Sequence, residues 1–97
     1  MFEIELTESA VEDLHFLRKA DRRHIVAEIE RHLSVEPLVP TLRRKPLRPN
    51  LLAPWELRIG DFRVFYDVEE GARIVMIRAV GWKEHNRLLI RGKEFLL

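Results

Sequence analysis

The segment that most constrains the fold of this 97-residue chain is residues 55–68, where apolar and polar side chains alternate on both sides of Gly60-Asp61. A period of two places successive side chains on opposite faces of a β-strand. Gly60 supplies the backbone freedom that a tight hairpin turn needs. Residues 55–59 and 62–68 are therefore predicted to form the two strands of a β-hairpin.

The same period predicts which charged side chains share a face of this hairpin. Glu56 and Arg58 lie on one face of the first strand, and Arg63 and Phe65 lie on one face of the second. Pairing through the tight turn can bring Arg58 and Arg63 together on one surface. Like charges opposite each other destabilise a sheet unless an anion, such as a phosphate, lies between them. Ion pairs with Glu56 or Asp61 are the alternative explanation.

The segments around the hairpin predict an α+β fold. An alternating N-terminal strand over residues 2–6 precedes two amphipathic helices, which are expected to be capped by Thr7 and Asp21. A further strand is expected over residues 73–80, and a short C-terminal helix over residues 84–90. The expected architecture is an antiparallel helical hairpin packed on a mainly antiparallel four-stranded sheet.

A long loop, residues 35–54, lies between the helices and the hairpin and contains all five prolines. Long ordered loops in compact domains tend to be functional. Residues 37–63 hold six bases against two acids, whereas residues 1–36 hold nine acids against five bases. A cationic middle on an acidic chain is a candidate polyanion site, and a solvated face with ordinary ion pairs is the alternative. Four of these bases cluster in the loop, namely Arg43, Arg44, Lys45 and Arg48.

Composition limits the class of protein. The length predicts a single domain over residues 1–97. The chain has no cysteine, and its four histidines lack the spacing of a helical zinc site, so neither a metal nor another cofactor is expected. No apolar run is long enough to span a membrane, and the acidic N-terminal residues are unlike a signal peptide, so a cytoplasmic protein without membrane partners is expected.

Residues 57–66 resemble the signature hairpin of RelE-type toxins, which follows the pattern L-R-x-G-D-[YF]-R-x-x-Y. Upstream, Lys45-Pro46-Leu47 is similar to the K-x-L that precedes this hairpin. Downstream, Arg78-Ala79-Val80-Gly81 is similar to the end of the last family strand. Together with the helix pair, the resemblance covers nearly the whole chain. It implies a RelE-like fold and membership of the RelE/ParE superfamily of type II toxin–antitoxin systems.

The resemblance implies a toxin that is a ribosome-dependent mRNA endoribonuclease and blocks translation. In ribonuclease members, the ribose 2′-hydroxyl attacks the adjacent phosphate without a metal, and cations stabilise the charge that develops. Arg58 falls where members place a strand cation, and Arg63 falls at the arginine that contacts the scissile phosphate. Lys83 falls near a basic residue after the last strand's glycine, and His85 is a candidate acid–base group. RNA contacts are expected from the loop cations Lys45, Arg43, Arg44 and Arg48.

Two departures from the ribonuclease members leave the proton carriers open. Glu56 stands where the best-studied members carry a second strand lysine, and it is either a base or a paired or peripheral charge. Leu89 lies near the position of their C-terminal tyrosine, and Tyr66 is expected in the core. The same fold also carries ParE-like proteins that inhibit DNA gyrase without catalysis. A gyrase inhibitor and a non-toxic relative therefore remain alternatives.

Partners also follow from the resemblance. A cognate antitoxin is expected to lay a helix or an extended segment over the toxin. The acidic helix pair, with Phe16 on its outer side, is a candidate surface for it. The nuclease hypothesis adds mRNA and the ribosome as partners, and the alternative adds DNA gyrase.

Overall fold

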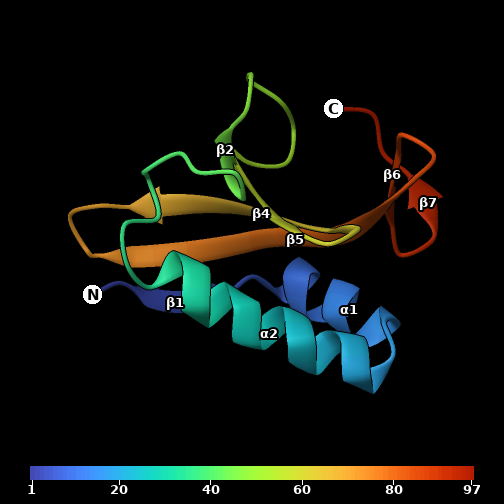
Figure 1. Cartoon of the computed structure of the whole chain (residues 1–97), viewed down its shortest axis with the longest axis horizontal. Helices are drawn as coiled ribbons and strands as arrows, with labels where there is room; N and C mark the ends of the chain where they lie inside the picture. The colour runs from blue at the N-terminus through green and yellow to red at the C-terminus, as the bar shows by residue number, and fades with distance from the viewer.

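The computed structural model describes residues 1–97 and places two helices on one face of a seven-stranded sheet (Figure 1). The predicted α+β class is confirmed. The helices are α1 (Glu8–Phe16) and α2 (Lys19–Leu33), and neither is long and apolar enough to cross a bilayer. The strands are β1 (Glu3–Leu6), β2 (Arg44–Pro46), β3 (Trp55–Ile59), β4 (Phe62–Glu69), β5 (Ile74–Glu84), β6 (Arg87–Ile90) and β7 (Lys93–Glu94).

Strands β2 to β7 lie in chain order and each pairs antiparallel with the next. The predicted hairpin is confirmed as β3 and β4, with Gly60 at φ +58° in a two-residue turn. Strand β1 pairs parallel with the first part of β5, from Glu3 opposite Ile74 to Leu6 opposite Ile77. The last residues of β5 pair with β6 instead. The long strand β5 therefore joins the N-terminal and C-terminal parts of the sheet.

The two helix starts differ in how they are capped. Thr7 is the N-cap of α1 as predicted, and its hydroxyl accepts a hydrogen bond from the Ala10 N–H at 3.1 Å. The prediction for Asp21 is wrong, because α2 begins at Lys19 with Arg18 at the N-cap position. Asp21 lies instead in the first turn of α2, 3.4 Å from Arg18 Nε. A carboxylate at this place interacts favourably with the helix dipole but does not cap the helix.

Both faces of the sheet are covered, by different parts of the chain. The main core lies between the helices and the sheet and includes Leu57, Val64 and Tyr66 from the hairpin. A smaller core lies on the opposite face, where Phe65 packs with Ala53, Ala79 and Leu88 beneath the loop and the C-terminal strands. In Figure 1 the helices lie below β4 and β5, and β2 with its loop lies above them. The predicted alternation of Val64, Phe65 and Tyr66 thus separates two cores.

The expected C-terminal helix over residues 84–90 is wrong, and so is the expected number of four strands. His85 and Asn86 have φ values of +50° and +66° and form the turn between β5 and β6. Asn and His are among the residues that adopt this left-handed conformation most readily. In the strand β6 that follows, Leu88 packs on the smaller core. The sheet gains β6 and β7 in this region, and β2 within the proline-rich loop.

A β-bulge interrupts the pairing of β4 with β5. Phe65 lies opposite Ala79 and Tyr66 lies opposite Ile77, so Arg78 is an extra residue in β5. A bulge bends its strand and changes which side chains face the core. Ile77 and Val80 consequently both belong to the main core, although they are three residues apart.

Candidate functional site

The two arginines of the hairpin lie directly opposite each other. Arg58 and Arg63 are register partners across β3 and β4, so the prediction that the turn brings them together is confirmed. Arg63 is only 7% exposed, and its Nη1 donates to the carbonyls of Gly60 at 2.8 Å and Phe62 at 2.9 Å. A guanidinium has five N–H donors, so these bonds orient Arg63 and leave other donors available for a ligand.

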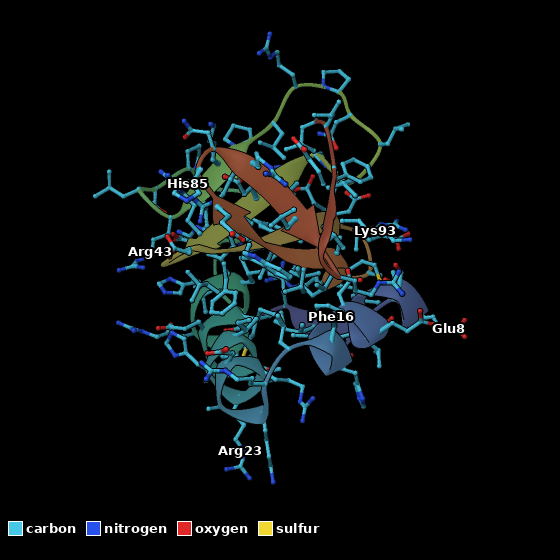
Figure 2. The ribbon with its side chains drawn as sticks, turned by 90° about the vertical axis from the view of Figure 1, so that its right-hand side faces the viewer. Glu8, Phe16, Arg23, Arg43, His85 and Lys93 are labelled. Atoms are coloured by element: carbon cyan, nitrogen blue, oxygen red, sulfur yellow. The ribbon has the colours of Figure 1, made fainter.

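A groove of about 510 Å³ lies over this face of the sheet. The predicted catalytic residues Arg58, Arg63, Lys83 and His85 all line it, and Lys45 is the one loop cation that does. Figure 2 shows His85 and Arg43 on the same side of the molecule, with Lys93 and Glu8 on the other side. The complete lining is Lys45, Leu47, Glu56, Arg58, Asp61, Arg63, Lys83, His85, Asn86 and Leu97.

The cations of this groove have no acidic partners. No carboxylate oxygen lies within 4.0 Å of a side-chain nitrogen of Lys45, Arg58, Arg63 or Lys83. The alternative explanation, ion pairs with Glu56 or Asp61, is therefore not found. Burial lowers the pKa of the Arg63 guanidinium; the Glu56 carboxylate raises it, Arg58 lowers it further, and Asp61 raises it. Arginine still remains protonated, so the groove holds four cations, Lys45, Arg58, Arg63 and Lys83, beside the carboxylates of Glu56 and Asp61.

Glu56 is one of two acidic side chains that line the groove, together with Asp61. It lies on β3 with Lys45 opposite on β2 and Phe65 opposite on β4. The residue is only 6% exposed, and its carboxylate forms neither a hydrogen bond nor an ion pair. Its charge nevertheless acts on the arginine pair, because the Glu56 carboxylate raises the pKa of the Arg63 guanidinium.

The end of β5 brings Lys83 and His85 to the groove. The Lys83 N–H donates to the Asp61 carbonyl at 2.7 Å, which ties β5 to the β3–β4 turn. Gly81 lies opposite Arg63, and a Cβ there would overlap the backbone carbonyl of Leu89. Glycine therefore permits the close approach of β6. His85 is exposed on the following turn, in a left-handed conformation that is sparsely populated and often found at functional sites.

Three of the four loop cations do not line the groove. Arg44 faces the helices and donates to the carbonyls of Val39 at 2.9 Å, His32 at 2.6 Å and Val35 at 3.3 Å. It thereby satisfies carbonyls at the end of α2 and anchors the loop. Arg43 and Arg48 are exposed outside the groove. The alternation within β2 explains the difference, because Lys45 pairs with Glu56 whereas Arg44 pairs with the core residue Leu57.

Aromatic side chains do not contribute to the groove lining. Leu89, at the position where ribonuclease members carry tyrosine, is buried and pairs with Trp82. Tyr66 lies in the core as predicted, and its hydroxyl donates to the Pro37 carbonyl at 2.7 Å. Burial raises the pKa of this tyrosine. Asn86 lines the groove and was not predicted, although Asn and His both adopt the left-handed conformation of this turn more readily than most residues.

A larger cavity, of about 1180 Å³, lies between the loop and the C-terminal strands. It contains Asp13, Asp67 and Arg78 but none of the residues expected to contact RNA. No cluster of three or more His, Cys, Asp or Glu side chains that could hold a metal ion occurs in the structure. The smaller groove is therefore the candidate functional site.

Comparison with known proteins agrees with this geometry. The model of the ParE toxin of the type II toxin–antitoxin system, parDE, matches residues 4–86. The chain belongs to this family. The match spans β1 to the β5–β6 turn and includes most of the groove. The chain is thus a type II toxin of the RelE/ParE superfamily, as its hairpin predicted.

Solved structures of other toxins share the fold. The RelBE2 toxin–antitoxin complex from Mycobacterium tuberculosis matches with 29% identity and a TM-score of 0.73, over 84% of this chain and 98% of that chain. The archaeal RelE–RelB complex from Pyrococcus horikoshii OT3 matches with 22% identity and a TM-score of 0.67, over 87% and 97%. The isolated E. coli RelE toxin matches with 16% identity and a TM-score of 0.69, over 88% and 87%. No curated protein matches the sequence. The predicted RelE-like fold is confirmed.

Proposed function

We propose that this toxin is a metal-independent, ribosome-dependent mRNA endoribonuclease that blocks translation. The observation that carries the proposal is the opposed pair Arg58 and Arg63, which has no carboxylate partner. Two guanidinium groups directly opposite each other destabilise a bare sheet. A phosphate between them would form charge-assisted hydrogen bonds with both, so the pair fits a phosphodiester.

The groove residues suit cleavage through the ribose 2′-hydroxyl. The 2′ oxygen forms a bond to phosphorus, the bond from phosphorus to the 5′ oxygen breaks, and the products are a 2′,3′-cyclic phosphate and a 5′-hydroxyl end. Arg58 and Arg63 stabilise the negative charge that develops on the phosphate oxygens. We assign His85, supported by Lys83, to protonate the leaving 5′ oxygen. Lys45 contacts a neighbouring phosphate.

A cognate antitoxin is part of the proposal. The M. tuberculosis and P. horikoshii structures are complexes of related toxins with their antitoxins. Phe16 on α1, 55% exposed and stacked on Trp82, is a candidate contact for this partner. Co-purification with the product of the neighbouring gene tests the idea, and failure to form any complex would count against it. The toxin would act in the cytoplasm, where mRNA and ribosomes are found.

The second candidate function is inhibition of DNA gyrase without catalysis. It is favoured by the match to the ParE toxin model and by the absence of an aromatic side chain from the groove. The same fold is compatible with both activities.

One experiment separates the candidates. Purified toxin is incubated with translating ribosomes and mRNA, and in parallel with gyrase and plasmid DNA. The expected result is new mRNA 5′ ends at defined positions, with unchanged supercoiling by gyrase. Intact transcripts beside stalled gyrase complexes would establish the second candidate, and no effect in either assay would indicate a non-toxic relative.

A further inference from the structure

The groove has three successive levels along its strands. Glu56 on β3 marks the first level, and the pair Arg58–Arg63 marks the second, two residues further along. Lys83 marks the third level, because its N–H donates a hydrogen bond to the carbonyl of Asp61, which lies beyond Arg63. The chain then turns at His85. Neighbouring side chains on one face of a strand are about 7 Å apart along it. Glu56 and the Lys83–His85 end therefore lie on opposite sides of the arginine pair.

This order matches the needs of an in-line displacement. The attacking and leaving oxygens lie on opposite sides of the phosphorus atom. One end of the site must therefore accept a proton and the other must donate one. With the phosphate held between Arg58 and Arg63, a cationic donor end at His85 leaves the proton-accepting end at Glu56.

The state of Glu56 fits this role. Glu56 is only 6% exposed as a whole residue, but its carboxylate is not a buried unpartnered group, because it lines the groove. No side chain or backbone group of the protein forms a hydrogen bond or an ion pair with it. Its negative charge also weakens the attraction of the groove for phosphate. A carboxylate that faces the groove and is bound by no protein group is free to accept a proton there.

We propose that Glu56 is the general base of the cleavage reaction, an assignment that rests on the proposed ribonuclease function. Its carboxylate accepts the proton of the 2′-hydroxyl as the 2′ oxygen bonds to phosphorus. The leaving 5′ oxygen takes its proton from the opposite end of the groove. One proton enters the enzyme at Glu56 and one leaves it at the donor end, so solvent exchange restores the starting state.

The test separates binding from cleavage. In Glu56→Gln, the shape is kept but the proton acceptor is lost, and cleavage of ribosome-bound mRNA should slow by about 10²-fold or more. Affinity is measured with ribosomes carrying an mRNA that has a 2′-deoxynucleotide at the cleavage position and so cannot react. Glu56→Gln should bind this complex as tightly as the wild type or more tightly, because a negative charge has left the groove. Glu56→Asp should recover part of the cleavage rate.

Glu69 offers a control with the same side chain. It is exposed at the end of β4 and lies outside the groove. Glu69→Gln removes the same charge from the molecule, so it should leave both binding and cleavage unchanged. Equal losses of cleavage in Glu56→Gln and Glu69→Gln would overturn the assignment and show a general electrostatic effect.

The outcomes distinguish this inference from the proposed function. Wild-type cleavage with an equally fast Glu56→Gln variant would overturn the inference and leave the ribonuclease function standing. Weaker ribosome binding by Glu56→Gln, in proportion to its loss of cleavage, would also overturn it and indicate a structural role. No cleavage by the wild type would remove both the proposed function and the inference.

Discussion

Two buried carboxylates in different regions of the molecule have opposite surroundings. Asp13 lies on α1 at the edge of β5 and is 2% exposed, and Glu56 lies on the groove face and is 6% exposed. Asp13 Oδ2 accepts the Val80 N–H at 3.0 Å, and Arg91 Nε lies 2.9 Å from Oδ1, although no hydrogen bond reaches that atom. Glu56 has no comparable partner.

The surroundings of Asp13 explain its place in the fold. Strand β1 ends at Leu6 and β6 joins β5 only from Trp82, so the part of β5 between Ile77 and Trp82 has no strand on that side. Asp13 accepts the N–H of Val80 there in place of a strand, and Arg91 joins Asp13 to the C-terminal hairpin. Asp13 therefore holds three parts of the fold together, whereas Glu56 has no protein partner and faces the groove.

The largest effect is expected from Arg63→Ala. This change removes the buried cation that faces Arg58, and cleavage should fall by about 10³-fold because charge on the phosphate is no longer stabilised. Cells expressing the variant should grow normally. Arg63→Lys, which keeps the charge but not the fork of donors, should retain part of the toxicity. Unchanged toxicity of Arg63→Ala would show that Arg63 is not a phosphate contact.

Asp13→Ala should lower the stability of the fold. The variant leaves the Val80 N–H buried without an acceptor and removes the link to Arg91, so the free energy of unfolding should fall by about 2 kcal/mol. Urea denaturation measures this loss, and cleavage per folded molecule should not change. A slower reaction at unchanged stability would contradict the structural assignment of Asp13.

Arg44 and Lys45 extend the test to neighbouring residues. Arg44→Ala removes bonds to three carbonyls and should lower the free energy of unfolding by about 1–2 kcal/mol. Lys45→Ala should leave stability within about 0.5 kcal/mol, as is usual for an exposed residue, but weaken ribosome-bound mRNA binding by a few-fold. Urea denaturation and binding assays on both variants measure these effects. Weaker binding by Arg44→Ala together with lower stability of Lys45→Ala would refute the two assignments.

The smallest effect is the pH dependence contributed by Asp13. Burial raises the pKa of this carboxyl above 3.8, although the Val80 N–H and Arg91 lower it. The folded state therefore binds the proton more tightly than the unfolded state, and this contribution to stability falls as pH rises through the window above 3.8. The unfolding free energy of wild type minus that of Asp13→Asn should decrease across this window. An increase would show that pairing with Arg91 outweighs burial.

Local patterns predicted the hairpin and the facing of Arg58 and Arg63, because the period of two and Gly60 determine both. They missed the strand β6, since residues 87–90 are too short and apolar for the period to distinguish a helix from a strand. The extra residue Arg78 in β5 depends on pairing with a distant strand.

Tertiary contacts also determine that Arg44 faces the helices while Lys45 faces the groove, and that no protein group binds the Glu56 carboxylate. The sequence alone placed Glu56 on the same face of the hairpin as Arg58, but it did not show which of the loop cations reaches that face.

The parallel pairing of β1 with β5 has a consequence for the synthesis of this toxin. Glu3 reaches its partner Ile74 only after most of the chain has been made. Contacts so distant in sequence form late and slowly. Lys83 and His85 follow β5's first residues, so the groove cannot assemble before them. A growing chain that has not yet reached Lys83 and His85 would therefore carry no complete groove.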